Sequence, residues 1–260
     1  MAEPSTEIIN CGELSLPVLR SPGTETYLAL QPPGAQPYVV APADQPLAEV
    51  GQFVAERQGV LRELQSEMLK HFRKTNSLKC RFHSGDVAHI LGRPFMLRSY
   101  PLSATKKSQR GTRGRANVLA RMQSDISVIE LFVAQANNYD QGKAAFFSLA
   151  ESIFGRNIPS LLQQCLPRVF PQVQLPANVN YRPMRDTWVR IDPDHDAVWF
   201  SESLIPYPGD TVVYAFLTEA IKCYAPDADA ATRQQLLQAG LPNWSAQRDL
   251  LADPQSPYAF

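Results

Sequence analysis

Four consecutive segments decide the fold: RPMRDTW at 182–188, DAVWFSESLI at 196–205, PYPGD at 206–210 and TVVYAFLTEAIKCY at 211–224. The last segment predicts a buried helix, because its apolar residues recur every three or four positions. These residues are Val213, Phe216, Leu217, Ala220, Ile221 and Tyr224. Asp210 is expected at the N-cap of this helix, where its carboxylate would accept a hydrogen bond from a free backbone N–H.

The order of these segments, a basic run ending in tryptophan, a hydrophobic strand, a proline-rich turn and an apolar helix, resembles the YgjP-like metallopeptidases. That family has a zincin fold and is related to the SprT group. Its helix carries H-E-x-x-H, in which two histidines one turn apart bind Zn²⁺ and the glutamate acts as general base on the metal-bound water. The matching positions here are Thr218, Glu219 and Lys222, and the family's third histidine falls on Ala228.

The residues at these positions retain the glutamate and lack all three histidines. A lysine ammonium has no lone pair, and alanine has no donor atom, so neither replaces a neutral imidazole. The family's W-G-S-C segment also differs and reads WVRI at 188–191. The resemblance, which spans about residues 8–252, therefore implies a zincin-like domain without metal ligands or cofactor.

A zincin-like domain without zinc implies a catalytically inactive protein that acts by binding. The expected role is that of an accessory or scaffold to a protein partner or to a nucleic-acid-processing complex. The expectation of a nucleic-acid-processing complex comes from the family resemblance, because members of that family are often encoded near restriction and modification systems.

The alternative is an active metal-dependent hydrolase with a rebuilt site around Glu219. Asp227, Asp229 or His195 could supply further ligands, because carboxylates bind hard cations. The segments that contain them, DPDHDA at 192–197 and APDAD at 225–229, also fit a polar turn between strands and a helix-capping loop. Metal content distinguishes the two hypotheses.

Glu219 and Lys222 lie three positions apart on the predicted helix, close enough to form an ion pair. We hypothesise that the ammonium of Lys222 replaces the absent dication as counter-charge in a closed site. In that case, Lys222→Met should destabilise the fold measurably.

The composition restricts the class of protein. The chain has 260 residues, enough for one large domain or two small ones, and its 25 basic and 25 acidic residues give a net charge of zero. This balance argues against a protein that coats nucleic acid or membrane with its whole surface. No stretch approaches the ~18 apolar residues of a membrane span, and the N-terminus lacks signal-peptide features. The cysteines form no C-x-x-C, so we expect reduced thiols in a cytoplasmic protein without membrane contact.

The segments before the deciding stretch predict a β-rich region over 1–140. Alternating residues at 7–20, 26–31 and 36–42 predict a β-meander, and the apolar spacing at 47–70 predicts a helix. Two further strand-like segments, at 85–102 and 117–135, enclose a basic hairpin loop at 103–115.

The remainder of the chain predicts a zincin-like α/β region over 141–260. Helical patterning runs from 142 to 165, where Gly155 and Pro159 suggest two helices. Asp229 is expected to cap a helix at about 230–239, and a short helix closes the chain. The expected fold class is therefore α+β, with N-terminal antiparallel β-sheet elements and a zincin-like α/β C-terminal part.

The loop SATKKSQRGTRGR at 103–115 is the candidate binding element outside the helix. It fits a solvated hairpin tip, and it also fits a contact to nucleic-acid phosphates, although no aromatic residue interleaves its charges. Its basic residues are Lys106, Lys107, Arg110, Arg113 and Arg115.

Two other groups of residues are expected to be structural. Cys80, His83 and His89 match no common zinc spacing, so we assign them ordinary loop and strand positions. Trp188 and Trp199 are expected to fill the core, because they flank a hydrophobic strand.

Overall fold

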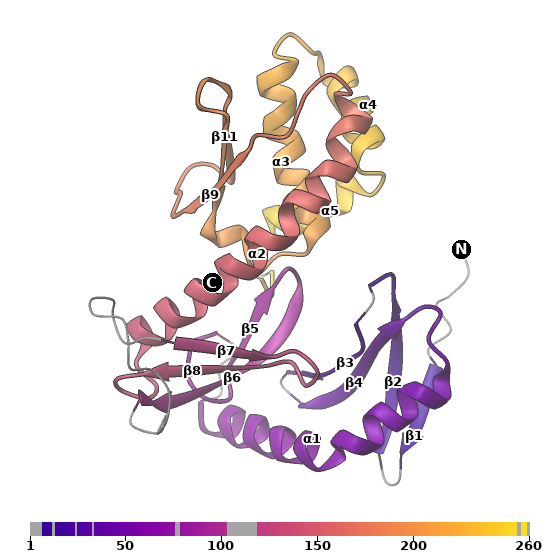
Figure 1. Cartoon of the computed structure of the whole chain (residues 1–260), viewed down its shortest axis with the longest axis vertical. Coiled ribbons are helices and arrows are strands. Elements are labelled where there is room, and N and C mark those ends of the chain that lie inside the picture. Colours follow the sequence, from indigo (N-terminus) through magenta and orange to yellow (C-terminus); the bar gives the residue numbers. More distant parts are fainter. Residues whose placement is uncertain are drawn as a thin grey trace. The chain divides into compact units, whose positions relative to one another are not determined.

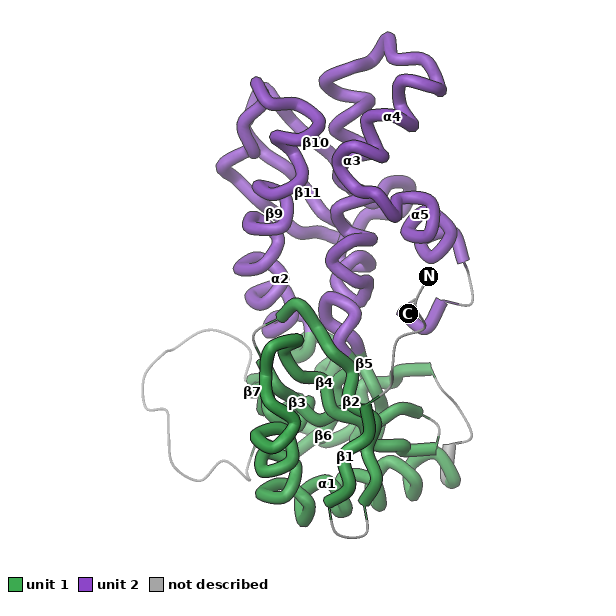
Figure 2. The backbone as a smooth tube through the Cα atoms, turned by 90° about the vertical axis from the view of Figure 1, so that its right-hand side faces the viewer, with its two compact units in different colours: residues 1–88, 94–146 green, residues 89–93, 147–260 purple. Residues whose placement is uncertain are grey.

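The structure is a computed structural model, which describes residues 7–11, 14–23, 25–32, 34–75, 79–102, 119–253 and 256–258. The described residues form helices and small mixed sheets joined by turns, so the α+β class is confirmed (Figure 1). The chain divides into two compact units, coloured in Figure 2. Unit 1 comprises residues 1–88 and 94–146, and unit 2 comprises residues 89–93 and 147–260.

The first sheet of unit 1 contains strands β1 (Glu7–Cys11), β2 (Leu14–Ser21), β3 (Tyr27–Gln31) and β4 (Gln36–Pro42), in the order β1-β2-β4-β3. The two expected antiparallel hairpins are present, but β2 and β4 join them as a parallel pair, so the sheet is mixed and is not a meander. This order places the apolar strands β2 and β4 at the centre, where both edges are paired.

Helix α1 (Leu47–Thr75) packs against this sheet and extends the predicted helix by five residues. The face predicted from the apolar spacing is the buried one, and it forms one core with residues from β2 and β4. Its five most buried side chains are at most 1 % exposed: Val50, Val54, Leu61, Leu64 and Met68.

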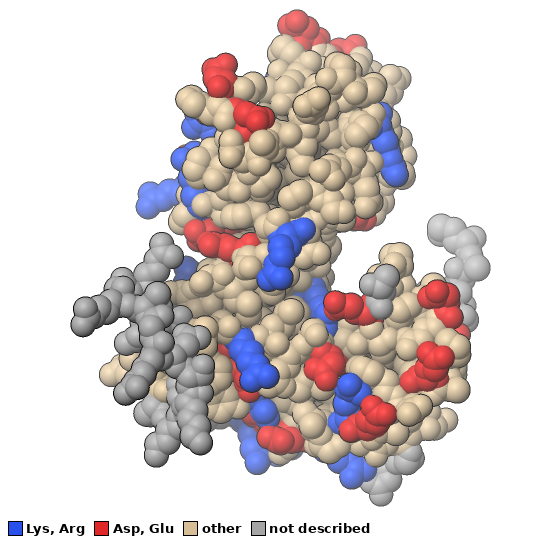
Figure 3. Space-filling model, viewed as in Figure 1, with Lys and Arg blue, Asp and Glu red and all other residues tan. Residues whose placement is uncertain are grey.

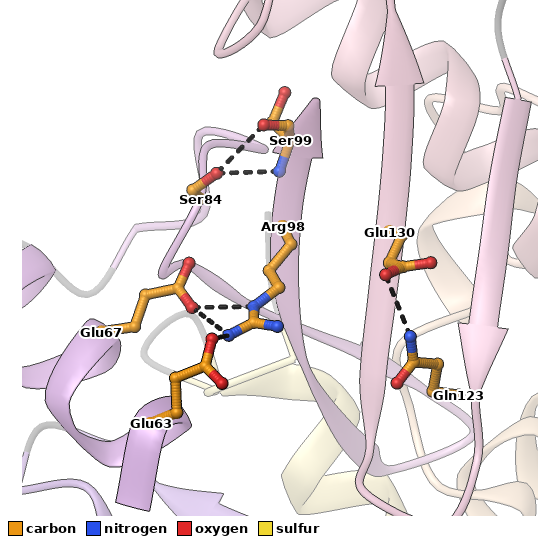
Figure 4. Close-up of polar contacts among 7 residues, drawn as sticks. All are labelled: Glu63, Glu67, Ser84, Arg98, Ser99, Gln123 and Glu130. Atoms are coloured by element: carbon orange, nitrogen blue, oxygen red, sulfur yellow. Dashed lines mark hydrogen bonds and ion pairs between the residues drawn. The ribbon is translucent and has the colours of Figure 1, made fainter. Parts of the chain in front are cut away.

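The second sheet contains β5 (Val87–Ile90), β6 (Arg93–Pro101), β7 (Leu119–Gln123) and β8 (Val128–Val133), in the order β5-β6-β8-β7. Arg98 on β6 ties this sheet to α1, because its guanidinium lies 2.8 Å from Glu63 and from Glu67 (Figure 4). On the neighbouring strands, Gln123 donates a hydrogen bond to Glu130 at 2.9 Å.

The tight turn between β5 and β6 belongs to unit 2. Leu91 and Gly92 both have positive φ, 50° and 80°, as in the two-residue turns that match the twist of a hairpin. Their backbone N–H groups donate to the carbonyl oxygens of Ile205 (2.8 Å) and Pro206 (3.0 Å). These bonds hold a leucine in a conformation that usually favours glycine.

Helix α2 (Tyr139–Val169) is one continuous helix, so the predicted break near Gly155 and Pro159 is wrong. Burial of one apolar face keeps the helix intact around its internal prolines, with Phe154, Ile158 and Leu162 at 0 % exposure. Gly155 has a different role: a Cβ there would lie 3.1 Å from the Tyr181 hydroxyl. The glycine therefore allows the close approach of a neighbouring strand.

Unit 2 contains a three-stranded sheet of β9 (Asn178–Arg182), β10 (Val189–Asp192) and β11 (Ala197–Ser201), in the order β10-β11-β9. The 3₁₀ turn η2 (Pro193–His195) links β10 to β11. The inner face of this sheet is buried, and Phe200 packs against Phe154 of α2, with ring centroids 5.8 Å apart.

Three helices follow the sheet: α3 (Gly209–Tyr224), α4 (Ala230–Gly240) and α5 (Trp244–Ala252), with the 3₁₀ turn η3 (Glu202–Leu204) before them. The predicted N-cap of α3 is wrong, because the helix already begins at Gly209, with Pro208 as its N-cap. Asp210 lies in the first turn and accepts a hydrogen bond from Asn243 at 3.1 Å. The predicted cap of α4 is confirmed: Asp229 accepts from the Thr232 N–H at 2.7 Å, which lowers the pKa of its carboxyl.

The Tyr181 hydroxyl gives a stability prediction. It is buried without a hydrogen-bond partner among the described residues, and burial raises its pKa to about 12. Tyr181→Phe should therefore increase the free energy of unfolding by about 1 kcal/mol in urea denaturation. In the natural chain, Gly155→Ala would bring a Cβ within 3.1 Å of the Tyr181 hydroxyl oxygen. Tyr181→Phe removes that oxygen, so in the double variant alanine should stabilise the protein by its helix propensity of about 1 kcal/mol. A loss of stability in Tyr181→Phe would mean that the hydroxyl is hydrogen-bonded in solution.

Candidate binding groove

A groove of about 240 Å³ lies in unit 2, between α3, α5 and the start of β10. The three positions that resemble the H-E-x-x-H motif, Thr218, Glu219 and Lys222, all line it. The complete lining is Thr187, Trp188, Val189, Tyr214, Ala215, Thr218, Glu219, Lys222, Arg248, Leu251 and Ala252.

The amphipathic pattern of α3 turns these side chains toward the groove. Ala215, Thr218, Glu219 and Lys222 recur at spacings of one, three and four, which places them along one stripe of the helix. Most of the rest of the helix is buried. This stripe is therefore narrow, and its three polar residues, Thr218, Glu219 and Lys222, line the groove.

Glu219 and Lys222 form the predicted ion pair, with Lys222 Nζ 3.0 Å from Glu219 Oε2. The predicted closed site is wrong, because the side chain of Lys222 is 61 % exposed and that of Glu219 is 26 % exposed. The ammonium lies in water and is not a buried counter-charge. An exposed pair of this kind contributes little to stability.

The residues at the three family histidine positions do not fit a zinc ion. The Thr218 hydroxyl donates to the carbonyl oxygen of Tyr214 at 2.9 Å, and the ammonium of Lys222 is paired with Glu219. Ala228 lies in the loop between α3 and α4, where its N–H donates to the Ala225 carbonyl at 3.1 Å, and it is not part of the groove lining.

The residues of the alternative, rebuilt metal site lie in the turn η2 and in the loop that caps α4. Asp229 caps α4. His195 is exposed in η2, where its Nδ1 lies 2.9 Å from Asp192 Oδ2, and this carboxylate raises the pKa of the imidazole. Asp227 is exposed in the loop before α4. Among the described residues, no three His, Cys, Asp or Glu side chains gather in an arrangement that could hold a metal ion.

Trp188 lies at the rim of the groove, so its predicted place in the core is wrong. The side chain is 37 % exposed and packs edge-to-face against Tyr207, with ring centroids 5.9 Å apart. Trp199 is half-buried. Arg248 and Leu251 of α5 also line the groove, and neither was predicted as a site residue; their three-residue spacing on a short amphipathic helix was the available signal.

The basic loop lies outside the described residues, which stop at Leu102 and resume at Leu119. Nucleic-acid binding through the five residues of this loop stays a prediction. The residues concerned are Lys106, Lys107, Arg110, Arg113 and Arg115.

The cysteines and histidines near the β5–β6 hairpin have the structural positions that we expected. His89 lies in β5 and packs edge-on against Tyr258 at 5.0 Å between ring centroids, and burial lowers its pKa to about 4. Burial raises the pKa of the Cys80 thiol to about 12, and the His83 N–H donates to Asp86 at 2.9 Å. All four cysteines of the chain are free thiols: Cys11, Cys80, Cys165 and Cys223.

Comparison with protein-family models, with curated proteins and with solved structures found no match. The similarity to the YgjP-like metallopeptidases therefore depends on the sequence pattern alone. None of the helices in the described part of the chain is long and apolar enough to cross a membrane.

The exposure of the ion pair changes the expected result for Lys222→Met. Exposed pairs three or four residues apart on a helix contribute about 0.3–0.5 kcal/mol, so the free energy of unfolding should fall by no more than this amount. Urea denaturation at low and high salt provides the measurement. A loss above about 1 kcal/mol would restore the closed-site hypothesis.

Proposed function

We propose that this chain is a catalytically inactive, zincin-like relative of the metallopeptidases that binds an extended segment of a protein partner. One observation supports the proposal most directly. The helix positions that resemble the family's catalytic motif line an open groove, and an ammonium–carboxylate pair occupies them in place of metal ligands.

The size of the groove favours a polypeptide as ligand. Sites for drug-sized molecules and cofactors are typically about 300–1,000 Å³. The groove, at about 240 Å³, suits one large side chain of a partner. Trp188 and Leu251 offer apolar contact, and two exposed ion pairs, Lys222 with Glu219 and Arg248 with Asp249, offer polar contact.

The strand next to the groove supports an extended ligand. β10 is an edge strand of its sheet and pairs only with β11 among the described strands. Trp188, which directly precedes β10, and Val189, its first residue, line the groove. A partner segment that adds to this edge as a further strand would place alternate side chains beside the groove.

The accessory role proposed for the protein agrees with this mode of binding. The partner would be a protein, either alone or as part of a nucleic-acid-processing complex. We also propose a cytoplasmic location, which the four free thiols support.

Trp188→Ala tests the proposed function. Peptides selected from a random library on the intact protein should bind about thirtyfold more weakly to this variant, because truncating an aromatic anchor residue costs about 2 kcal/mol or more. Tyr139→Ala is the control, since Tyr139 is a 47 % exposed aromatic residue of α2 and lies outside the groove. Equal affinities of both variants would exclude the groove as the binding site.

The alternative hydrolase makes a different prediction in the same preparation. An active enzyme would contain a stoichiometric divalent cation and would cleave peptides, and Glu219→Gln would abolish cleavage. Elemental analysis and a peptidase assay of protein purified without chelator provide the measurements. Metal-dependent cleavage that is lost in Glu219→Gln would overturn the proposal of an inactive protein.

A further inference from the structure

The outer face of the three-stranded sheet in unit 2 combines arginines with a tryptophan. The register pairs Trp199 of β11 with Arg190 of β10 on one side and with Asn180 of β9 on the other. Directly paired residues project from the same face of a sheet, and so do residues two apart on a strand. Arg182, two residues after Asn180, therefore shares this face.

The two arginines are available to a ligand. Both are exposed, and the guanidinium of Arg182 lies over the ring of Trp199, 4.7 Å from its centroid. Within the described residues, neither has a carboxylate at ion-pair distance. The exposed Arg185 follows in the segment after β9, and in Figure 3 basic side chains gather at the edge of unit 2 where Figure 1 draws β9 and β11.

The segment 182–192 carries three arginines and two aspartates, which leaves an excess of one positive charge. The hydrogen bond from His195, at 2.9 Å, and the charge of Arg190 both lower the pKa of Asp192, which lies two residues after Arg190 on β10. Asp186, beside Arg185, is the other exposed acid in the segment between β9 and β10. The chain as a whole has no net charge, so this excess is local.

We propose that Arg182, Arg190 and Trp199 form a binding surface for single-stranded nucleic acid. Guanidinium groups match the geometry of phosphate oxygens, and they also stack on flat rings. Unpaired bases stack on exposed aromatic and guanidinium planes, as they do on the sheets of single-strand-binding modules. A flat sheet does not enter the groove of a duplex, which admits a helix or a two-stranded ribbon. None of these three residues lines the groove or belongs to the 103–115 segment.

Salt-dependent binding of labelled oligonucleotides tests this surface. Fluorescence anisotropy with oligothymidylate and oligouridylate of about twelve nucleotides should show binding to the full chain. Arg182→Gln combined with Arg190→Gln should reduce the slope of log K against log salt by about 1.4, since each phosphate contact on a single strand contributes about 0.7. Trp199→Leu should weaken binding at least about fivefold, through lost stacking.

Matched controls separate this surface from general charge effects. Arg121→Gln combined with Arg233→Gln removes two exposed arginines elsewhere and should leave the slope unchanged. Changing the five basic residues of the 103–115 loop to serine should leave the Trp199 effect in place. If Trp199→Leu does not fold, the salt slope of the Arg182→Gln, Arg190→Gln variant still tests whether this surface binds the oligonucleotides.

Three results would overturn the proposal. The first is no measurable binding of either oligonucleotide at low salt. The second is equal loss of binding in both double arginine variants. The third is that an acidic peptide or anionic lipid vesicles displace the labelled oligonucleotide as effectively as an unlabelled oligonucleotide does. That result would indicate a surface that binds anions in general.

Discussion

Replacing Asp86 with alanine should lower the free energy of unfolding by about 3–5 kcal/mol. Its side chain is 4 % exposed, and both carboxylate oxygens are used. Oδ1 lies 2.7 Å from His71 Nε2, and Oδ2 accepts from the backbone N–H groups of Arg81 (2.7 Å) and His83 (2.9 Å). Alanine would leave these three donors without their acceptor beside a buried position, and such losses are among the costliest of single substitutions.

The position of Asp86 explains why unit 1 needs this carboxylate. It connects His71, near the end of α1, to the loop that leads into β5. Gly85 has φ 92°, and a Cβ there would overlap the side chain of His71. The loop therefore approaches the helix closely, and the carboxylate holds it there.

Urea denaturation measures the effect of this change. Asp44→Ala, at an exposed aspartate in the turn before α1, is the matched control and should change stability by less than about 0.5 kcal/mol. Asp86→Asn should fall between the two, because the amide keeps one acceptor oxygen and loses the charge. Equal midpoints for Asp86→Ala and Asp44→Ala would contradict the assigned role.

Acidification from pH 7 to pH 4 should remove about 3 kcal/mol of stability through His89 alone. Burial lowers the pKa of this imidazole from 6.5 to about 4 in the folded protein. Below pH 6.5 the unfolded chain therefore binds a proton that the folded protein does not. Its contribution is complete above pH 6.5 and is lost progressively as the pH falls toward 4.

His89→Phe isolates this contribution. Phenylalanine keeps a ring against Tyr258 and cannot be protonated, so the free energy of unfolding should fall less steeply between pH 6.5 and 4 than in the natural protein. His195 acts in the opposite sense, because Asp192 raises its pKa and its contribution is lost as the pH rises. The lowered pKa values of Asp192 and Asp229 affect stability only when the pH falls to about 3.8, the ordinary pKa of an aspartate, and below. Identical slopes for both proteins would assign the acid sensitivity to other groups.

The sequence predicted those elements that depend only on residues within a few positions of one another. The buried face of α1, the cap of α4 by Asp229 and the existence of α3 follow from apolar spacing and capping chemistry. The ion pair of Glu219 with Lys222 follows from their three-residue spacing.

Features that depend on distant parts of the chain were not predictable in this way. Gly155 and Pro159 would end an isolated helix, but the buried face of α2 keeps them helical. The insertion of β4 between β2 and β3 depends on strand pairing that no local pattern encodes. The exposure of Trp188 at the groove and of Lys222 beside it depends on where α5 packs.

The turn of the β5–β6 hairpin determines how the protein can be divided for experiments. Unit 2 is assembled from two separate stretches of the chain, and the short stretch supplies the N–H groups that bond to Ile205 and Pro206. A recombinant fragment that starts at residue 147 would lose both donors and the glycine that lies against Pro208. Dissection by simple truncation should therefore give a poorly folded product, whereas a fragment that retains the hairpin should keep the structure of unit 2.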